Sequence, residues 1–215
     1  MNRRFLLIAA LIAASLLASG LLLLDFPLAH WIRDSGLANA KFFTAGLGVL
    51  DMLLGLRVSY WLAAAVLIPL GLLGIVFAAF IRLPRGLAPA LLVAGMTQAL
   101  TIGLMMLGKN GFGRLRPTEF FESGDWTSLW FVGGGSFPSG HASFYFGLFL
   151  PLAAAAPKAW QRATLVAIPV FVAAARLDML RHFLSDVAAS ALIAACVALL
   201  LNPLMQRWQP RSHPA

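Results

Sequence analysis

Long apolar runs separated by short charged segments dominate the pattern of this chain. About 17–25 apolar residues suffice for a helix to cross a lipid bilayer. Runs of this kind cover Phe5–Leu24, Ser59–Ile81 and Ala88–Leu107, and shorter or more polar ones cover His141–Ala156, Ala163–Ala175 and Ser185–Leu201. We therefore predict an all-α fold, a polytopic membrane helix bundle with about six transmembrane helices, forming a single domain over residues 1–215.

A further apolar stretch, Phe42–Leu56, differs from these runs. It is interrupted by Gly46, Gly48 and Asp51. At about fifteen residues it fits an interfacial or re-entrant segment better than a span. The first run follows Arg3 and Arg4, as a secretory signal would, but it exceeds the usual length of about 7–15 apolar residues. We interpret it as a retained first helix.

The charged residues divide between the two sides that six spans would create. One side holds Arg3, Arg4, Arg82, Arg85, Lys158, Arg162, Arg207 and Arg211, without any acidic residue. The other side holds eight basic residues (Arg33, Lys41, Arg57, Lys109, Arg114, Arg116, Arg176 and Arg181) and all eight acids (Asp25, Asp34, Asp51, Glu119, Glu122, Asp125, Asp178 and Asp186). An excess of basic residues in short loops marks the cytoplasm. We expect both termini inside and the longer connections outside.

Composition supports a membrane protein over a soluble one. Hydrophobic residues make up 60% of the chain and charged residues 11%, and the mean hydropathy is +0.86. A soluble domain could not bury this much apolar surface. The net charge of +8 therefore indicates orientation in a membrane, and we expect no nucleic-acid partner. The single cysteine, Cys196, excludes an internal disulfide and a cysteine-based metal site.

Three polar clusters lie at the outer ends of predicted spans. They are Lys109–Pro117, Ser136–His141 and Arg176–Asp186. Charge packed against helix ends in so apolar a protein is costly and usually functional. Because a helix bundle brings the ends of its helices together, we expect the three clusters to converge.

The residue types in these clusters suit phosphoryl transfer. Cations such as Lys109 and Arg116 neutralise phosphate oxygens, and a helix that begins near Ser139 and Gly140 presents backbone N–H groups to an anion. His182 and Asp186 are four residues apart and would share one face of a helix. The aspartate can then hold one ring nitrogen and leave the other free to attack phosphorus.

A second histidine, His141, can protonate the leaving oxygen. The sequence contains no evident acidic cluster for magnesium or zinc. We therefore expect neither a metal nor another cofactor.

Order and spacing in these clusters resemble the three signature motifs of the type 2 phosphatidic acid phosphatase superfamily. Six residues separate Lys109 from Arg116-Pro117, the second motif is Pro138–His141, and the third places Arg176, His182 and Asp186 in the pattern Arg-x5-His-x3-Asp. The resemblance extends from about the third span to the sixth. The first two spans are matched by architecture alone.

This resemblance implies a role for each matched residue. Lys109, Arg116 and Arg176 would bind the phosphate together with Ser139 and Gly140. His182 would be the nucleophile that forms a phosphohistidine, Asp186 would orient it, and His141 would be the general acid. The chain departs from the family at Ala175, where serine is common, and this puts one binding contact in doubt.

Simpler interpretations apply to single residues. Lys109, Arg114 and Arg116 can each be anchors at the membrane interface. Arg114 and Arg181 either widen the phosphate site or balance Glu119 and Asp178, and we favour the balancing role. We interpret the remaining polar and aromatic residues as structural: Gln98 as an interhelical hydrogen bond, Trp126 and Trp130 as interfacial aromatics, His30 and His213 as structural or solvated.

The leading hypothesis is therefore an enzyme that hydrolyses a lipid phosphate or pyrophosphate at the periplasmic face of a bacterial inner membrane. By resemblance, its substrate belongs to the class of phosphatidic acid, phosphatidylglycerol phosphate, undecaprenyl pyrophosphate or lipid A phosphate. A lipid phosphotransferase with the same intermediate is the close alternative. A lipid or anion transporter is disfavoured because transporters usually bind near the midplane and often have repeated halves. A vanadate-dependent haloperoxidase is disfavoured by the six apolar runs.

Overall fold

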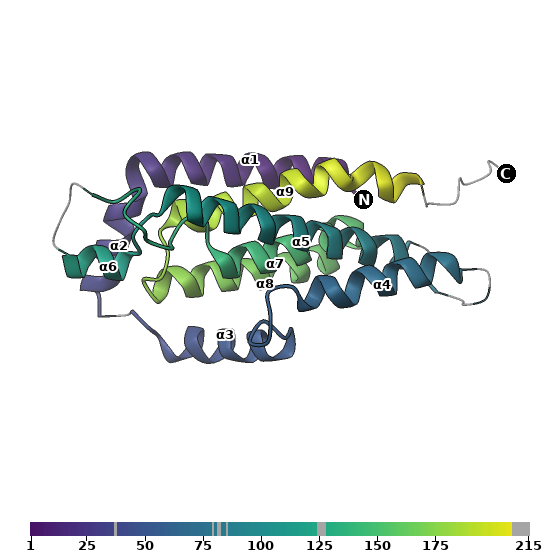
Figure 1. Ribbon diagram of the computed structural model, residues 1–215, viewed down its shortest axis with the longest axis horizontal. Helices are drawn as coiled ribbons and strands as arrows, with labels where there is room; N and C mark the ends of the chain where they lie inside the picture. The colour runs from purple at the N-terminus through teal and green to yellow at the C-terminus, as the bar shows by residue number, and fades with distance from the viewer. Residues whose placement is uncertain (37, 79, 81–82, 85, 124–127, 208–215) are drawn as a thin grey trace.

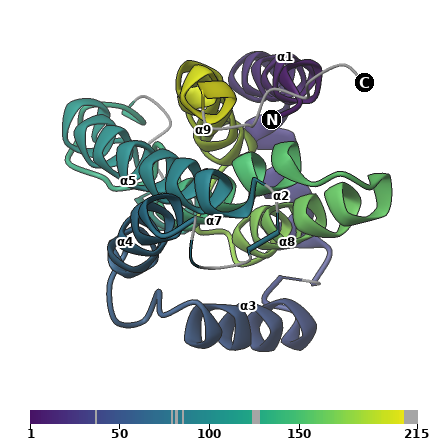
Figure 2. The same cartoon turned by 90° about the vertical axis from the view of Figure 1, so that its right-hand side faces the viewer.

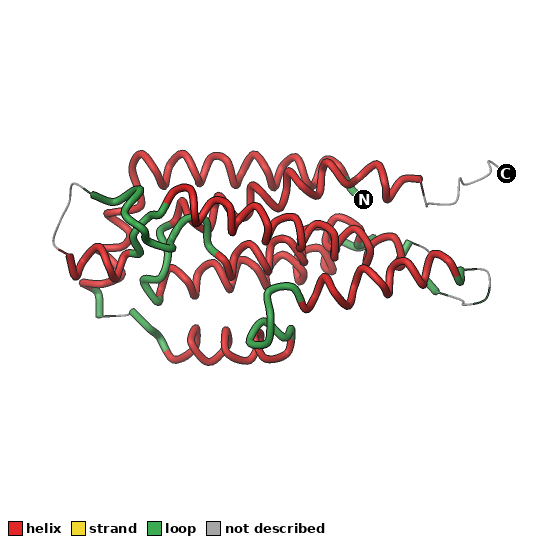
Figure 3. The backbone as a smooth tube through the Cα atoms, viewed as in Figure 1, coloured by secondary structure: helices red, strands yellow, loops and turns green. Residues whose placement is uncertain are grey.

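The computed structural model describes residues 1–36, 38–78, 80, 83–84, 86–123 and 128–207 of the chain. These residues form helices and loops without any strand (Figure 3), which confirms the all-α prediction. In chain order the helices are α1 (Arg3–Ser19), the π-helix η1 (Gly20–Leu24), α2 (Asp25–Asp34), α3 (Lys41–Leu53), α4 (Leu62–Val76), α5 (Leu87–Phe112), α6 (Pro117–Ser123), α7 (Gly140–Ala155), α8 (Ala159–Asp178) and α9 (Leu184–Arg207). Arg82, Arg85, Asp125, Trp126, Arg211 and His213 lie outside the described residues.

Six of these helices, α1, α4, α5, α7, α8 and α9, run along the long axis of one bundle (Figure 1) and coincide with the six predicted apolar runs. Helix α7 is the central one, since most of its residues are buried and it packs against α5, α8 and α9. Within the described residues, three helical segments can cross a membrane by length and composition: Arg3–Asp34, Leu87–Ser123 and Leu184–Leu204. Helices α4 and α7 are apolar but shorter. The count of six spans remains a prediction.

Two glycines allow α4 and α5 to pack closely. A Cβ atom at Gly71 would lie 2.6 Å from the backbone nitrogen of Leu92, and one at Gly74 would lie 2.7 Å from the Cβ of Ala88. Neither position accommodates a side chain. Small residues let membrane helices approach closely enough for backbone contact. These two glycines thus hold α4 against α5.

Helix α3 lies outside the six-helix bundle, on one side of it (Figures 1 and 2). It corresponds to the apolar stretch predicted to be interfacial or re-entrant, and it is too short to span a bilayer alone. It packs against α8, where Phe42 and Phe43 both lie against the ring of Phe171 at centroid distances of 5.5 Å. Leu47 is buried in the same core as Tyr145 of α7. The helix is thereby fixed against the bundle.

The two ends of the bundle are formed by different helices and loops. The start of α1 and the end of α9 lie together at one end, whereas α2, α6 and the loops that follow α5 and α8 lie at the other (Figure 1). The second end carries all three polar clusters found in the sequence. The charge pattern predicts that this end faces the outside.

Candidate active site

Backbone hydrogen bonds join the three polar clusters at this end of the bundle. The Ser139 N–H, at the start of α7, donates to the carbonyl of Asp186 in α9 (3.1 Å). The Ser136 N–H donates to the carbonyl of Arg114 (2.9 Å). Gly134 makes this approach possible, because a Cβ there would lie 2.3 Å from the Arg114 carbonyl oxygen. Segments far apart in the sequence are therefore held within one small site.

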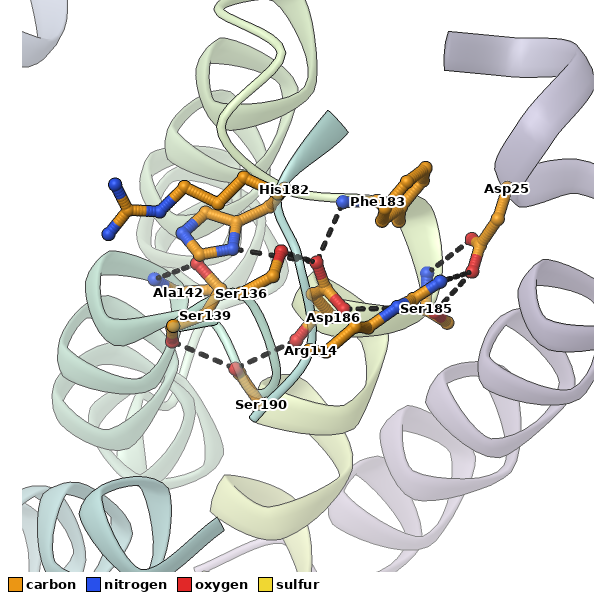
Figure 4. Close-up of polar contacts among 12 residues, drawn as sticks. Asp25, Arg114, Ser136, Ser139, Ala142, His182, Phe183, Ser185, Asp186 and Ser190 are labelled. Atoms are coloured by element: carbon orange, nitrogen blue, oxygen red, sulfur yellow. Dashed lines mark hydrogen bonds and ion pairs between the residues drawn. The ribbon is translucent and has the colours of Figure 1, made fainter. Parts of the chain in front are cut away.

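His182 and Asp186 form the centre of the site (Figure 4). Nδ1 of His182 lies 3.6 Å from Oδ2 of Asp186, which is beyond hydrogen-bond distance. The carboxylate is fixed by other donors, since Oδ2 accepts from the Ser136 hydroxyl (2.5 Å) and from the Phe183 N–H (2.8 Å). The expected placement of both residues on one helix is wrong: His182 lies in the bend that precedes α9, and Asp186 lies in the first turn of α9.

Burial determines the protonation state of the His182 ring. Burial lowers the pKa of the imidazole to about 4, although the neighbouring Asp186 carboxylate partly opposes this effect. The ring is therefore unprotonated at neutral pH. Because Nδ1 faces Asp186, the other ring nitrogen, Nε2, carries the lone pair that is free to attack.

Arg114 is the largest of the fully buried side chains, with 1% of its surface exposed. One guanidinium nitrogen, Nη1, donates to Asp186 Oδ1 (2.6 Å), and the other, Nη2, donates to Asp25 Oδ2 (2.7 Å). The guanidinium stacks between the rings of Trp130 and Phe183, 4.5 and 4.3 Å from their centroids. Arg114 does balance acids, as favoured from the sequence, but its partners are the buried Asp25 and Asp186 and not Glu119 or Asp178. Its burial also contradicts an anchor at the membrane interface. Trp130, predicted to be an interfacial aromatic, is a stacking partner of this arginine.

Asp25 extends this buried network to the first helices. Its carboxylate accepts from the backbone N–H (2.9 Å) and the hydroxyl (2.5 Å) of Ser185. The π-helix η1 directly precedes Asp25, and a Cβ at Gly20 would lie 2.8 Å from the Ser185 nitrogen. Sequence reasoning missed Asp25, although an acid at the end of an apolar run is a signal of function.

Lys109, Arg116 and Arg176 supply positive charge on the same side as His182. Lys109 donates to the carbonyl of Gly135 and is close enough to Arg116 and Arg176 for mutual repulsion. The buried Nε atoms of both arginines have no hydrogen-bond partner among the described residues. Buried donors without partners are rare in proteins and mark places where a ligand or water binds. The arrangement is that of an anion-binding site.

The start of α7 adds backbone donors to this site. The first N–H groups of a helix have no intrahelical acceptor, and its positive end favours an anion. Gly140 is the first residue of α7. The Ser139 hydroxyl caps the helix by accepting from the Ala142 N–H (3.4 Å), so its predicted contact with phosphate remains a prediction. Tyr60 packs against the start of α7, because a Cβ atom added at Gly140 would lie 3.2 Å from the Tyr60 hydroxyl.

His141, the predicted general acid, has a carboxylate partner that the sequence did not reveal. Its Nε2 lies 3.2 Å from Oδ2 of Asp51 in α3, and the Tyr145 hydroxyl donates to the other carboxylate oxygen (2.9 Å). The ring of Tyr60 meets the His141 ring edge-on at 6.2 Å. Asp51 was visible in the sequence only as the single acid of an apolar stretch.

The remaining predicted side chains have structural contacts. Gln98 donates from Nε2 to the Tyr60 carbonyl (2.6 Å). Tyr60 lies in the turn before α4, so this bond joins a helix to a connection and not two helices as expected. His30 packs against Phe121 with the ring centroids 4.9 Å apart. Ala175, which stands where the family commonly has serine, is fully buried in the apolar core with Val172.

Comparisons with known proteins place this site in a family. Searches among curated proteins and among solved structures found no matching chain. The family model of the PAP2 superfamily matches residues 87–210, which is more than half of the chain and contains all eight residues assigned to phosphate binding or catalysis. Members of this superfamily are phosphatases. The chain, with its apolar helices and its anion-binding site, belongs to the PAP2 superfamily.

Proposed function

We propose that this protein is an integral membrane phosphatase that hydrolyses a lipid phosphate or pyrophosphate ester through a phosphohistidine intermediate. The observation that carries the proposal is the meeting of an unprotonated, buried histidine with three cations at one end of an apolar helix bundle. The PAP2 superfamily match supports phosphate-ester chemistry. The apolar surface around the bundle supports a substrate whose hydrophobic part stays in the bilayer.

In the first chemical step, the His182 Nε2 lone pair attacks phosphorus. An N–P bond forms while the P–O bond to the lipid breaks, and His141 transfers a proton to the leaving oxygen. Lys109, Arg116 and Arg176 neutralise the phosphoryl oxygens as charge redistributes in the transition state. With a pyrophosphate substrate, the leaving group is the lipid monophosphate.

In the second step, water attacks the phosphohistidine. The water transfers a proton to His141, a P–O bond forms and the N–P bond breaks, so that inorganic phosphate leaves and both histidines return to their starting state. No step requires a metal ion. In the part of the chain that the structure describes, no group of three or more His, Cys, Asp or Glu side chains is placed to bind one.

Phosphate release from a panel of lipid phosphates tests this proposal. Purified protein in detergent with EDTA should release inorganic phosphate, and His182→Ala should abolish the release, because the nucleophile is lost. Lys158→Ala is a suitable control, since Lys158 is exposed and lies in the connection between α7 and α8, away from the site. The lipid that is hydrolysed fastest identifies the substrate.

The products distinguish hydrolysis from transfer. Free phosphate as the main product supports the phosphatase, whereas a phosphorylated lipid acceptor with little free phosphate would identify a phosphotransferase that uses the same intermediate. If folded wild-type protein releases phosphate from none of the lipids and transfers it to no acceptor, the proposed function is wrong. Loss of release in EDTA that returns with a divalent metal would contradict metal independence.

A further inference from the structure

The site contains a second histidine–carboxylate contact, separate from His182 and Asp186. It joins His141, at the start of α7, to Asp51, in the last turns of α3. The two residues are 90 positions apart, and their side chains meet at 3.2 Å between Nε2 and Oδ2. Both side chains are largely buried, with 21% of His141 and 14% of Asp51 exposed. Their separation in sequence means that only the position of α3 brings them together.

Asp51 is held in place from more than one direction. The Tyr145 hydroxyl donates to Oδ1 (2.9 Å), which leaves Oδ2 directed at His141. The backbone carbonyl of Asp51 accepts from the Leu56 N–H (2.9 Å) in the turn after α3. The carboxylate is therefore fixed by a side chain of the bundle and by the turn of its own segment.

The contact determines which nitrogen of His141 is available to a substrate. Because Nε2 lies against Asp51, the remaining ring nitrogen is Nδ1. Hydrogen bonding of one imidazole nitrogen sets the orientation of the ring and the place of its protons. Since a general acid must present its proton to one particular oxygen, this fixed orientation matters for catalysis.

We propose that Asp51 is a positioning residue for the general acid, and that α3 is the element that supplies it. This inference rests on the proposed function, in which His141 protonates the leaving oxygen. Asp51 holds Nε2, so that the bond broken during proton transfer is Nδ1–H and the bond formed is O–H on the departing lipid. Asp51 thus orients the general acid His141, and Asp186 orients the nucleophile His182.

Dependence on the leaving group tests this role. An alkyl oxygen, as in a short-chain phosphatidic acid, needs a proton in order to leave, whereas p-nitrophenolate is stable without one. Asp51→Asn should lower kcat/KM for the short-chain phosphatidic acid by about 10–100-fold, the range typical of residues that orient a catalytic group. The same variant should lower kcat/KM for p-nitrophenyl phosphate much less, by about threefold or less.

Three variants serve as controls. His141→Ala should show the same dependence on the leaving group with a larger loss. Adding Asp51→Asn to His141→Ala should cause no further loss, because the carboxylate then has no acid to position. Asp34→Asn removes an exposed carboxylate on α2 and should leave both substrates unaffected.

Tyr145→Phe provides a second test if Asp51→Asn folds poorly. It removes one of the contacts that hold Asp51 and keeps the aromatic ring in the core. We expect a smaller loss with the same preference for the aryl substrate.

The possible results separate the two proposals. Equal losses on both substrates, no loss at all, or a full additional loss in the double variant would overturn the role of Asp51 while leaving the phosphatase intact. Absence of phosphate release from every lipid by the wild-type protein would overturn the proposed function itself.

Discussion

At the scale of individual residues, the guanidinium group of Arg114 connects distant parts of the site. Arg114 lies between Asp25 and Asp186, which come from the beginning and the end of the chain, and its two terminal nitrogens donate to one carboxylate each. Asp186 needs such a partner, because it is fully buried and its charge has no access to water. The arginine therefore stabilises the carboxylate that faces His182.

Replacement of Arg114 by leucine should be strongly destabilising. It leaves two carboxylates buried without a counter-charge, and removal of one partner from a buried ion pair typically costs about 3–5 kcal/mol of the free energy of unfolding. Activity should also be lost as the Asp186 carboxylate moves. Thermal unfolding in detergent and phosphate release measure the two effects.

Two further variants show whether the loss of stability comes from the buried hydrogen bonds of Arg114. Arg114→Lys keeps the positive charge but cannot donate to both carboxylates through a planar fork, so it should restore only part of the stability. Arg33→Leu removes an exposed ion pair with Asp34 and should change stability by about 1 kcal/mol or less. A leucine variant at position 114 that is as stable as wild type would contradict the importance of this network.

Spacing in the sequence predicted some of these contacts and not others. The interval between His182 and Asp186 is short, so local geometry alone brings them near each other. The contacts of Arg114 with Asp25 and of His141 with Asp51 join positions 89 and 90 residues apart. Such contacts depend on how the helices pack, which no local pattern specifies. The resemblance thus named His141 and Asp186 as candidate site residues, whereas nothing in the sequence named Asp51 and Asp25 as the partners of His141 and Arg114.

At the scale of elements, the π-helix η1 links the first helices to the site. The widened turn at Gly20–Leu24 lies where α1 passes Ser185 of α9, and Gly20 has no room for a side chain. A Cβ there would lie 2.8 Å from the Ser185 nitrogen and 2.9 Å from Oδ1 of Asp25. π-Helical turns often occur at functional sites. Here the turn brings the Asp25 carboxylate to the start of α9.

Gly20→Ala should therefore weaken the protein. The added methyl group must displace α9 or the Asp25 carboxylate, and overpacking of this kind costs about 1–3 kcal/mol. Gly103→Ala is the matched control, since it lies inside α5 with no atom within 4 Å of its added Cβ. Alanine there should raise stability by as much as about 1 kcal/mol through helix propensity. Equal effects of the two substitutions in thermal unfolding would show that the contact at Gly20 is unimportant.

The apolar pattern predicted the elements well where it was long and unbroken. Each of the six runs contains a bundle helix, because a long apolar segment can satisfy its backbone in lipid only as a helix. The boundaries were less predictable: helical structure continues from α1 through η1 and α2 to Asp34, beyond the end of the first run at Leu24. Nothing in the apolar pattern indicated that α3 would carry the partner of His141.

At the scale of the whole molecule, the site is confined to one end of the bundle. The chain starts and α9 finishes at the opposite end (Figure 1). Helix α6 lies at the end that carries the site, and the connection between α7 and α8 lies at the other. The charge pattern predicts that the first of these ends faces outside and the second faces the cytoplasm.

Cysteine labelling in intact bacterial cells tests this orientation, starting from a variant in which the single cysteine, Cys196, is replaced by alanine. Glu122→Cys places a thiol on α6, and Lys158→Cys places one before α8; both positions are exposed. A membrane-impermeant maleimide should label position 122 in intact cells and position 158 only after the membrane is opened. The reverse pattern would put the site on the cytoplasmic face, and labelling of both positions in intact cells would contradict a single crossing of the membrane by α7, which lies between them. With the predicted pattern, the lipid phosphate must be presented from the outer leaflet, and phosphate is released outside the cell membrane.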